Sequence, residues 1–182
     1  MSRVGIYGGT FDPIHQGHLH VITQLFEKDL VDQLLVIPAG EPLLRSHAPV
    51  ASAQQRRTMC QLALAELPSE IAAKVQVNPI EVLRTGPSYA IDTVEAVAQN
   101  FPGDKIILVI GQDAAEKLDQ WHRIEELRTM VQFLVIGRPG YSGDGIDIGA
   151  LDVSATTIRQ GLSAEVSSSV AAFIRENNLY DN

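Results

Sequence analysis

The segment Gly8-Gly9-Thr10-Phe11-Asp12-Pro13-Ile14-His15-Gln16-Gly17-His18 decides how this chain is interpreted. It follows a short apolar run, Val4-Gly5-Ile6-Tyr7, and precedes a helical pattern. Glycines, a hydroxyl and two histidines therefore lie in one turn between a strand and a helix. In an open α/β fold this turn binds phosphate, because the amides of the helix N-terminus point at the ligand and carry partial positive charge. The segment thus predicts a nucleotide-binding protein.

Apolar runs alternate with helical patterns along the rest of the chain. Alternation of this kind is typical of a parallel sheet with right-handed crossovers. We therefore expect an α/β protein with a Rossmann-like, doubly wound parallel sheet. Strands are predicted at 4–7, 33–37, 74–77, 105–110 and 132–136. Helices are predicted at 17–28, 53 to about 67, 88–100, 113–118, 124–130, 154–162 and 166–177.

Two long stretches carry no regular pattern, 38–51 and 138–152. Both follow strands, so we expect both at the carboxyl edge of the sheet, where such folds bind ligands. Long loops in a compact domain are usually functional or mobile. The first loop ends at Ser52, which stands three residues before Gln55 in capping-box position for the next helix.

The composition is typical of one ordinary globular domain. The chain has 182 residues, of which 45% are hydrophobic and 20% charged. We expect a single domain over 1–182, with a C-terminal helical part at about 154–182 packed on it. No apolar stretch reaches the ~18 residues of a membrane helix, and the chain starts directly with a strand, so neither a membrane span nor a signal peptide is expected.

The single cysteine and the net charge narrow the class of protein further. Cys60 has no partner for an internal disulfide, which agrees with a reducing cytoplasm; we expect a buried thiol rather than a nucleophile. The formal net charge of −8 argues against a nucleic-acid-binding protein, which needs a basic surface. A site for small anions must therefore collect arginine, histidine or lysine locally.

His15 and His18 are the first candidates for chemistry. They are three residues apart at a helix start, so their rings can share one face. Two imidazoles above glycine amides can contact a polyphosphate and stabilise charge that develops on it. A simple capping turn with one surface histidine is the structural alternative. A metal site is the other, but no third ligand stands at a suggestive spacing.

A second helix start resembles an anion site. Val153-Ser154-Ala155-Thr156-Thr157-Ile158-Arg159 offers hydroxyls beside free amides, followed by a fixed cation. A routine N-cap with an exposed arginine is the alternative. Two such helix starts in one small domain favour a nucleotide held between them.

Three further sites have equally good structural explanations. Gly111-Gln112-Asp113 follows the most apolar strand, where a carboxylate can bind a ribose hydroxyl or a metal, or merely cap a helix. Trp121 is the only tryptophan and can be core or a plate for a flat ring. The run Arg84-Thr85-Gly86-Pro87-Ser88-Tyr89 can contact a ligand or simply begin a helix. Neither a GxxxxGK[ST] loop nor a GxGxxG motif is present, which argues against P-loop NTPases and ordinary dehydrogenases.

These segments, in this order, resemble bacterial nicotinate-nucleotide adenylyltransferases of the HxGH nucleotidyltransferase superfamily. GGTFDPIHQGHL resembles the first signature of that family and VSATTIR resembles its ISSTxIR signature. Those two alone also admit phosphopantetheine adenylyltransferase. RTGPSYAIDT, IGQDAAEKLDQW and VIGRPGY resemble the segments that separate the two groups, and the likeness covers nearly the whole chain.

The resemblance implies a nucleotidyltransferase-type fold and a reaction in which nicotinate mononucleotide attacks the α-phosphorus of ATP. The products are deamido-NAD and pyrophosphate, and Mg²⁺ accompanies ATP, with no metal ligands expected from the protein. It implies phosphate contacts, and hence catalysis, by His15 and His18. It implies ATP contacts by Gly8, Gly9, Thr10, Phe11, Gly111, Asp113, Ser154, Thr156 and Arg159. It implies acceptor contacts by Arg45, Thr85, Tyr89 and Trp121, with Trp121 stacked on the ring.

The chain departs from the family pattern at four places. Pro42-Leu43-Leu44-Arg45 stands where PPHK is common, Gln112 replaces the alanine of GAD, Ala155 replaces a serine of ISST, and Ala90 replaces a threonine. None of these changes removes HxGH or the terminal arginine, so we expect an active enzyme. The alternatives are an adenylyltransferase for nicotinamide mononucleotide or phosphopantetheine, or a non-catalytic nucleotide-binding module. We expect a cytoplasmic protein that forms a homodimer.

Overall fold

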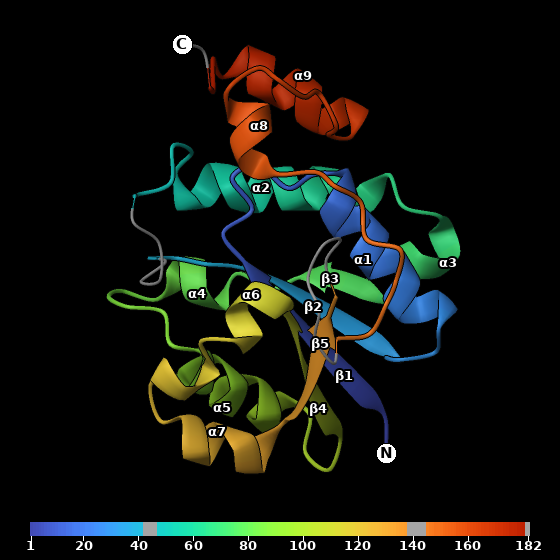
Figure 1. Ribbon diagram of the computed structural model, residues 1–182, viewed down its shortest axis with the longest axis vertical. Helices are drawn as coiled ribbons and strands as arrows, with labels where there is room; N and C mark the ends of the chain where they lie inside the picture. The colour runs from blue at the N-terminus through green and yellow to red at the C-terminus, as the bar shows by residue number, and fades with distance from the viewer. Residues whose placement is uncertain (42–46, 138–144, 181–182) are drawn as a thin grey trace.

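The computed structural model describes residues 1–41, 47–137 and 145–180. Its centre is a five-stranded sheet in the order β3-β2-β1-β4-β5, and every strand pair is parallel (Figure 1). This order confirms the predicted doubly wound α/β sheet. The strands are β1 (Arg3–Gly9), β2 (Gln33–Pro38), β3 (Val75–Val77), β4 (Lys105–Gly111) and β5 (Gln132–Ile136).

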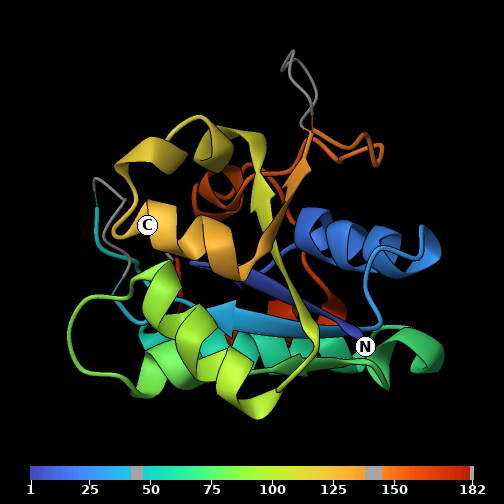
Figure 2. The ribbon, with the colours of Figure 1, turned by 90° about the horizontal axis from the view of Figure 1, so that it is seen from below.

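Helices cover both faces of the sheet (Figure 2). One face packs on α1 (Gln16–Glu27) and α2 (Ala53–Ala65), and the other on α5 (Ala90–Asn100) and α7 (Ile124–Met130). The sheet contributes side chains to both cores, because successive side chains along a strand point to opposite faces of the sheet. In β2, Leu34 and Val36 join the first core while Leu35 and Ile37 join the second. Because such strands are buried on both faces, their sequences are continuous apolar runs.

Most predicted elements are present, with small shifts at their ends. The helix predicted at 88–100 begins at Ala90, because Tyr89 keeps an extended backbone as its N-cap. The helix predicted at 154–162 is the shorter α8 (Ala155–Arg159), and Gly161 follows it with a φ of 70°. The helix predicted at 113–118 is divided into α6 (Gln112–Ala115) and the 3₁₀ turn η1 (Leu118–Gln120).

Sequence periodicity missed two helices of a single turn, α3 (Ser69–Ala72) and α4 (Ile80–Leu83). Helices this short present no repeating apolar face, so their pattern resembles that of a loop. The capping box at the start of α2 is confirmed: Gln55 N–H donates to Ser52 Oγ over 3.2 Å, and Ser52 N–H donates to Gln55 Oε1 over 2.9 Å.

The C-terminal helices pack on the edge of the domain formed by α2 (Figure 1). In α9 (Ser168–Glu176), Val170 is fully buried in the first core. Cys60 is buried in the same core, and this burial raises the pKa of its thiol. Within the described ranges, no helix has both the length and the apolar character needed to cross a membrane.

Glu66 joins α2 to the N-terminus of α9. Its carboxylate accepts the backbone N–H groups of Ser169 over 2.7 Å and Ser168 over 3.3 Å, and both serine hydroxyls also donate to it. A carboxylate is favoured here because the first amides of a helix have no partners within the helix. The hydrogen bonds from Ser169 lower the pKa of Glu66.

We expect Glu66→Gln to lower the melting temperature by about 2 °C at pH 7, as loss of a helix cap does in a chain of this length. A lowered pKa means that the contribution is present above the ordinary pKa of a glutamate and is lost as the pH falls through the lowered value. Thermal unfolding at pH 7 and pH 3 checks this, with the exposed Glu165→Gln as control. Equal losses at both pH values would contradict it.

Candidate active site

The turn after β1 is shaped by one residue in a left-handed conformation. Phe11 has a φ of 51°, which non-glycine residues rarely adopt. Its buried ring lies over Gly9, where a Cβ atom would come within 2.9 Å of the ring. Only glycine fits this position. Gly8, Gly9 and Thr10 line a cavity of about 670 Å³, so the turn presents them to a ligand.

His15 and His18 stack on each other at the start of α1, as their spacing predicts. Their ring centroids are 3.7 Å apart. The backbone N–H of His15 donates to Nδ1 of His18 over 3.1 Å, so the neutral His18 ring carries its proton on Nε2. Gly17 makes room for the pair, since a Cβ there would lie 3.0 Å from Cε1 of His15. His15 is at the same time the N-cap residue of α1.

The second helix start lies against the first turn. Arg159, at the end of α8, donates from Nη1 to the carbonyl of Asp12 over 2.7 Å, across 147 residues of sequence. Its other terminal nitrogen, Nη2, donates to Thr156 Oγ1 over 3.3 Å. Ser154 caps α8 by accepting the Thr157 N–H over 3.2 Å. The fold therefore brings together the two turns that the sequence marked as anion sites.

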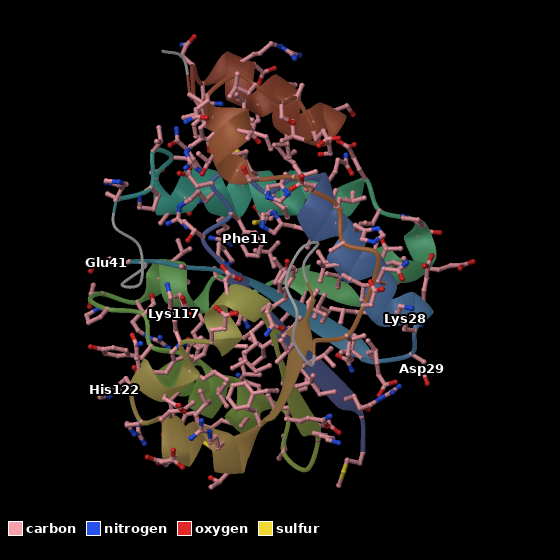
Figure 3. All side chains as sticks on the ribbon, in the orientation of Figure 1. Phe11, Lys28, Asp29, Glu41, Lys117 and His122 are labelled. Carbon is pink, nitrogen blue, oxygen red and sulfur yellow. The ribbon has the colours of Figure 1, made fainter. Side chains whose placement is uncertain are left out.

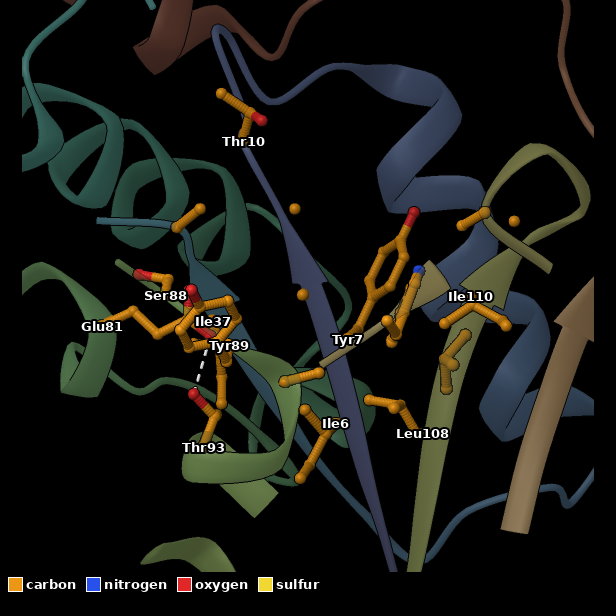
Figure 4. A pocket seen from close by; sticks show the side chains of 18 of the residues that line it. Ile6, Tyr7, Thr10, Ile37, Glu81, Ser88, Tyr89, Thr93, Leu108 and Ile110 are labelled. Carbon is orange, nitrogen blue, oxygen red and sulfur yellow. Dashed lines mark hydrogen bonds between the residues drawn. The ribbon is translucent and has the colours of Figure 1, made fainter. Parts of the chain in front are cut away.

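The cavity lies at the carboxyl ends of β1, β2 and β4, the edge at which doubly wound sheets bind ligands. Figure 4 shows Glu81, Ser88, Tyr89 and Thr93 on one side of β1, and Tyr7, Leu108 and Ile110 on the other. Among the predicted site residues, Gly8, Gly9, Thr10, Tyr89, Gly111, Asp113 and Trp121 line it.

The remaining predicted residues lie around the cavity or away from it. His15, His18, Ser154, Thr156 and Arg159 do not line the cavity. The two histidines follow the turn after β1, Arg159 bonds to the backbone of that turn, and Phe11 is buried within it. Thr85 is exposed beside Gly86, whose φ of 89° turns the chain, and it does not line the cavity. Arg45 lies outside the described residues.

Aromatic rings form one wall of the cavity. Tyr89 stacks on His122 with centroids 4.4 Å apart. Trp121 packs against the second core, and its buried Nε1 has no hydrogen-bond partner in the part of the chain that is described. A buried indole N–H usually has a hydrogen-bond acceptor, so an acceptor on a ligand would satisfy the Trp121 N–H. His122 and Lys117 lie on the side of the molecule formed by α5, α6 and α7 (Figure 3).

Sequence reasoning missed Glu81, which lines the cavity behind this wall. Its carboxylate accepts a hydrogen bond from the buried Thr93 hydroxyl over 2.8 Å, and Thr93 accepts one from Arg84 over 3.2 Å. Burial raises the pKa of the Glu81 carboxyl. These bonds tie α4, the turn before Tyr89 and α5 together. No sequence pattern indicated Glu81, because α4 is too short to show a helical periodicity of apolar residues.

Sequence reasoning also missed Arg56, the largest fully buried side chain of the described residues. Its guanidinium donates to the carbonyls of Thr10 over 2.7 Å, Gly40 over 3.1 Å and Ala51 over 3.3 Å. The guanidinium of Arg56 thus joins the turn after β1 to both ends of the loop after β2. A signal was present, since Arg56 stands at core spacing with Met59, Cys60 and Ala63 on the buried face of α2.

A doubly wound parallel sheet in which the helix starts at His15 and Ser154 meet at the carboxyl edge is the architecture of an α/β nucleotidyltransferase. The profile of the cytidylyltransferase-like family matches residues 6–171. A probable nicotinate-nucleotide adenylyltransferase of Bacillus pumilus is 34% identical, and the nicotinate-nucleotide adenylyltransferase of Bacillus subtilis is 30% identical; each match covers 100% of both chains. The chain belongs to the cytidylyltransferase-like family and, within it, to the nicotinate-nucleotide adenylyltransferases.

A solved structure has the same fold. The nicotinic acid mononucleotide adenylyltransferase of Plasmodium falciparum, complexed with NaAD, matches with a TM-score of 0.84 at 20% identity. The match covers 100% of this chain and 98% of that one.

We expect Arg56→Met to lower the free energy of unfolding by about 2–4 kcal/mol, because it leaves buried carbonyls without donors. Arg56→Lys should recover only part of this, since an ammonium lacks the planar fork that reaches several carbonyls. Urea unfolding measures both, with the exposed Arg175→Met as control. Full stability in Arg56→Met would show that water replaces the guanidinium without cost.

Proposed function

We propose that this protein transfers the adenylyl group of ATP to nicotinate mononucleotide, a step of NAD biosynthesis. The observation that carries the proposal is the contact between the two anion-binding turns, made where Arg159 donates to the Asp12 carbonyl over 2.7 Å beside the cavity. Membership in the family and the full-length match to its relatives support the same reaction.

The chemistry needs no nucleophile from the protein. A phosphate oxygen of the acceptor attacks the α-phosphorus of ATP, a new P–O bond forms, and the bond to the bridging oxygen of the β-phosphate breaks. Pyrophosphate carries away the electron pair of that bond. The protein's contribution is to align the two phosphates and to stabilise the charge that develops on the transferring group.

His15 and His18 are the groups we assign to the transferring phosphate. The Nδ1 of His18 accepts the His15 N–H, so the ring proton is on Nε2, and we assign this Nε2–H to an anionic oxygen of the phosphate. A donor held in advance by the fold needs no reorganisation when charge develops, which is the condition for strong electrostatic stabilisation. We expect the larger kinetic effect from His18.

ATP occupies the carboxyl edge of the sheet in this proposal. Its contacts come from the turn after β1, the start of α6 and the start of α8; the residues are Gly8, Gly9, Thr10, Phe11, Gly111, Asp113, Ser154, Thr156 and Arg159. The part of the chain that the structure describes contains no cluster of three His, Cys, Asp or Glu side chains able to hold a metal ion. We assign Mg²⁺ to the phosphates of ATP because Mg²⁺ commonly binds nucleotide phosphates with few protein ligands.

The acceptor occupies the aromatic side of the cavity. We assign Trp121 to stacking on the pyridine ring and Tyr89 to the same wall. The contact of Thr85, which is exposed and does not line the cavity, stays a prediction. The role of Arg45 stays a prediction. We further propose that the protein is cytoplasmic and forms a homodimer. Light scattering measures the oligomeric state.

Pyrophosphate release from ATP tests the reaction, with nicotinate mononucleotide, nicotinamide mononucleotide and phosphopantetheine as acceptors in turn. We expect release with the nicotinate nucleotide above all. No release with any acceptor would leave a nucleotide-binding module, and release with phosphopantetheine alone would overturn the acceptor.

We expect His18→Ala to lower kcat by about a hundredfold or more, as loss of one transition-state donor does. His20→Ala is the matched control, because His20 lies on the same helix and bonds the Ile148 carbonyl instead. It should change kcat by less than about threefold. A normal rate in His18→Ala would make the histidine pair purely structural.

We expect Trp121→Ala to raise the KM for the nicotinate nucleotide more than the KM for ATP, because it removes the plate on which the ring stacks. Trp121→Phe keeps a flat ring and should recover most of the loss. Initial rates with each substrate varied separately give both constants. Equal effects on the two KM values would place Trp121 in the core alone.

A further inference from the structure

Asp12 stands at the centre of an unusual set of contacts. This buried carboxylate accepts the backbone N–H groups of Val50 over 2.9 Å and Ala51 over 3.0 Å. It also accepts the hydroxyl of Tyr180 over 2.8 Å, across 168 residues of sequence. Its other neighbour is Arg159, whose Nη1 lies 3.9 Å from Oδ2. The last described residue of the chain therefore reaches the turn that begins the active site.

The backbone at the end of α9 is bent to make this contact. Asn178 has a φ of 49° and Tyr180 a φ of 66°, both in the left-handed region that costs a side-chain-bearing residue energy. Between them Leu179 is 8% exposed and packs in the first core. Leu179 anchors the segment, and the two left-handed residues turn the phenol toward Asp12. Such backbone strain persists only where the surrounding contacts hold it.

The hydroxyl is a dependable donor. Burial raises the pKa of Tyr180, and its hydrogen bond to Asp12 raises it further, so the phenol stays protonated at neutral pH. A hydrogen bond that a neutral phenol donates to a carboxylate is stronger than one between two neutral groups.

Arg159 competes for the same carboxylate. It donates to the carbonyl of Asp12 over 2.7 Å, while its distance to Oδ2 is too long for a hydrogen bond. With Tyr180 and Ala51 both on Oδ1 and Val50 on Oδ2, the carboxylate is well supplied with donors. Removal of the phenol hydroxyl takes one donor from Oδ1, and the guanidinium of Arg159, 3.9 Å from Oδ2, is placed to turn from the carbonyl to the carboxylate.

We propose that Tyr180 is a positioning residue of the adenylyl-transfer site. Its hydroxyl holds the carboxylate of Asp12, and Asp12 held in this way keeps Arg159 bonded to the backbone of the turn after β1. The guanidinium of Arg159 is then available to the phosphates of ATP. The inference rests on the proposed function for the identity of the ligand. The role belongs to the ATP side of the site, because Tyr180 and Asp12 do not line the cavity that holds Tyr89 and Trp121.

Tyr180→Phe tests this proposal, because it removes one oxygen and keeps the ring. We expect kcat to fall about five- to tenfold and the KM for ATP to rise by a similar factor, with the KM for the acceptor unchanged. Leu179→Val is the matched control: it weakens the anchor and lowers the melting temperature while it leaves the hydroxyl, so its KM for ATP should stay within about twofold of the native value.

Binding of a non-hydrolysable ATP analogue, measured by calorimetry on the full chain at low temperature, gives a readout that needs no acceptor and no turnover. We expect about fivefold weaker binding in Tyr180→Phe and no further loss when Tyr180→Phe is added to Arg159→Met, since the hydroxyl acts on ATP only through the guanidinium. Independent losses in this double-mutant cycle would overturn the proposal.

Unchanged kcat and analogue binding in Tyr180→Phe would also overturn it, as would equal losses for ATP and the acceptor. If the native chain binds the analogue and transfers nothing, the proposed function fails, and the analogue measurement still decides the role of Tyr180.

Discussion

The hydrogen bonds from one buried guanidinium hold the ligand-binding edge of this protein together. Arg56 reaches the carbonyls of Thr10, Gly40 and Ala51, so the turn after β1 and the loop after β2 share one fixed point. Burial of a cation is costly unless its donors are used, which is why these bonds constrain the loops so strongly. Gly40 is also crowded from the other side, since a Cβ atom there would lie 2.2 Å from the carbonyl oxygen of Glu81.

The sheet order supplies the rest of the geometry. With β1 in the middle and the direction of winding reversed on either side of it, the turns after β1 and β4 meet at one edge. The aromatic wall lies at this edge on the side of α5, and α8 approaches the same edge from the C-terminal part of the chain. Each group arrives on a different connection, yet all of them face the same edge, because parallel strands end together. The C-terminal segment then closes on the first turn through Asp12.

The sequence predicted the strands, the long helices and the sheet class, because these features depend on period and on turn chemistry at short range. It also marked, as candidate anion sites, the two turns whose glycines and hydroxyls stand next to each other in the chain and which the fold brings into contact. It did not indicate Glu81, which lies on a single-turn helix, or the contacts of Asp12 with Tyr180 and Arg159, which span more than a hundred residues. The acceptor contact of Thr85 stays a prediction: its motif is local, and the residue is exposed beside the turn at Gly86.

The lone thiol has a practical consequence. Cys60 is fully buried, and its raised pKa keeps it protonated, so alkylating reagents, which attack thiolates, find no target in the folded chain. Two cysteines placed on the surface would then be the only reactive thiols, without any change to the native one. Fluorophores or spin labels attached in pairs, one on α9 and one beside the loop after β2, would report the distance between those segments during turnover.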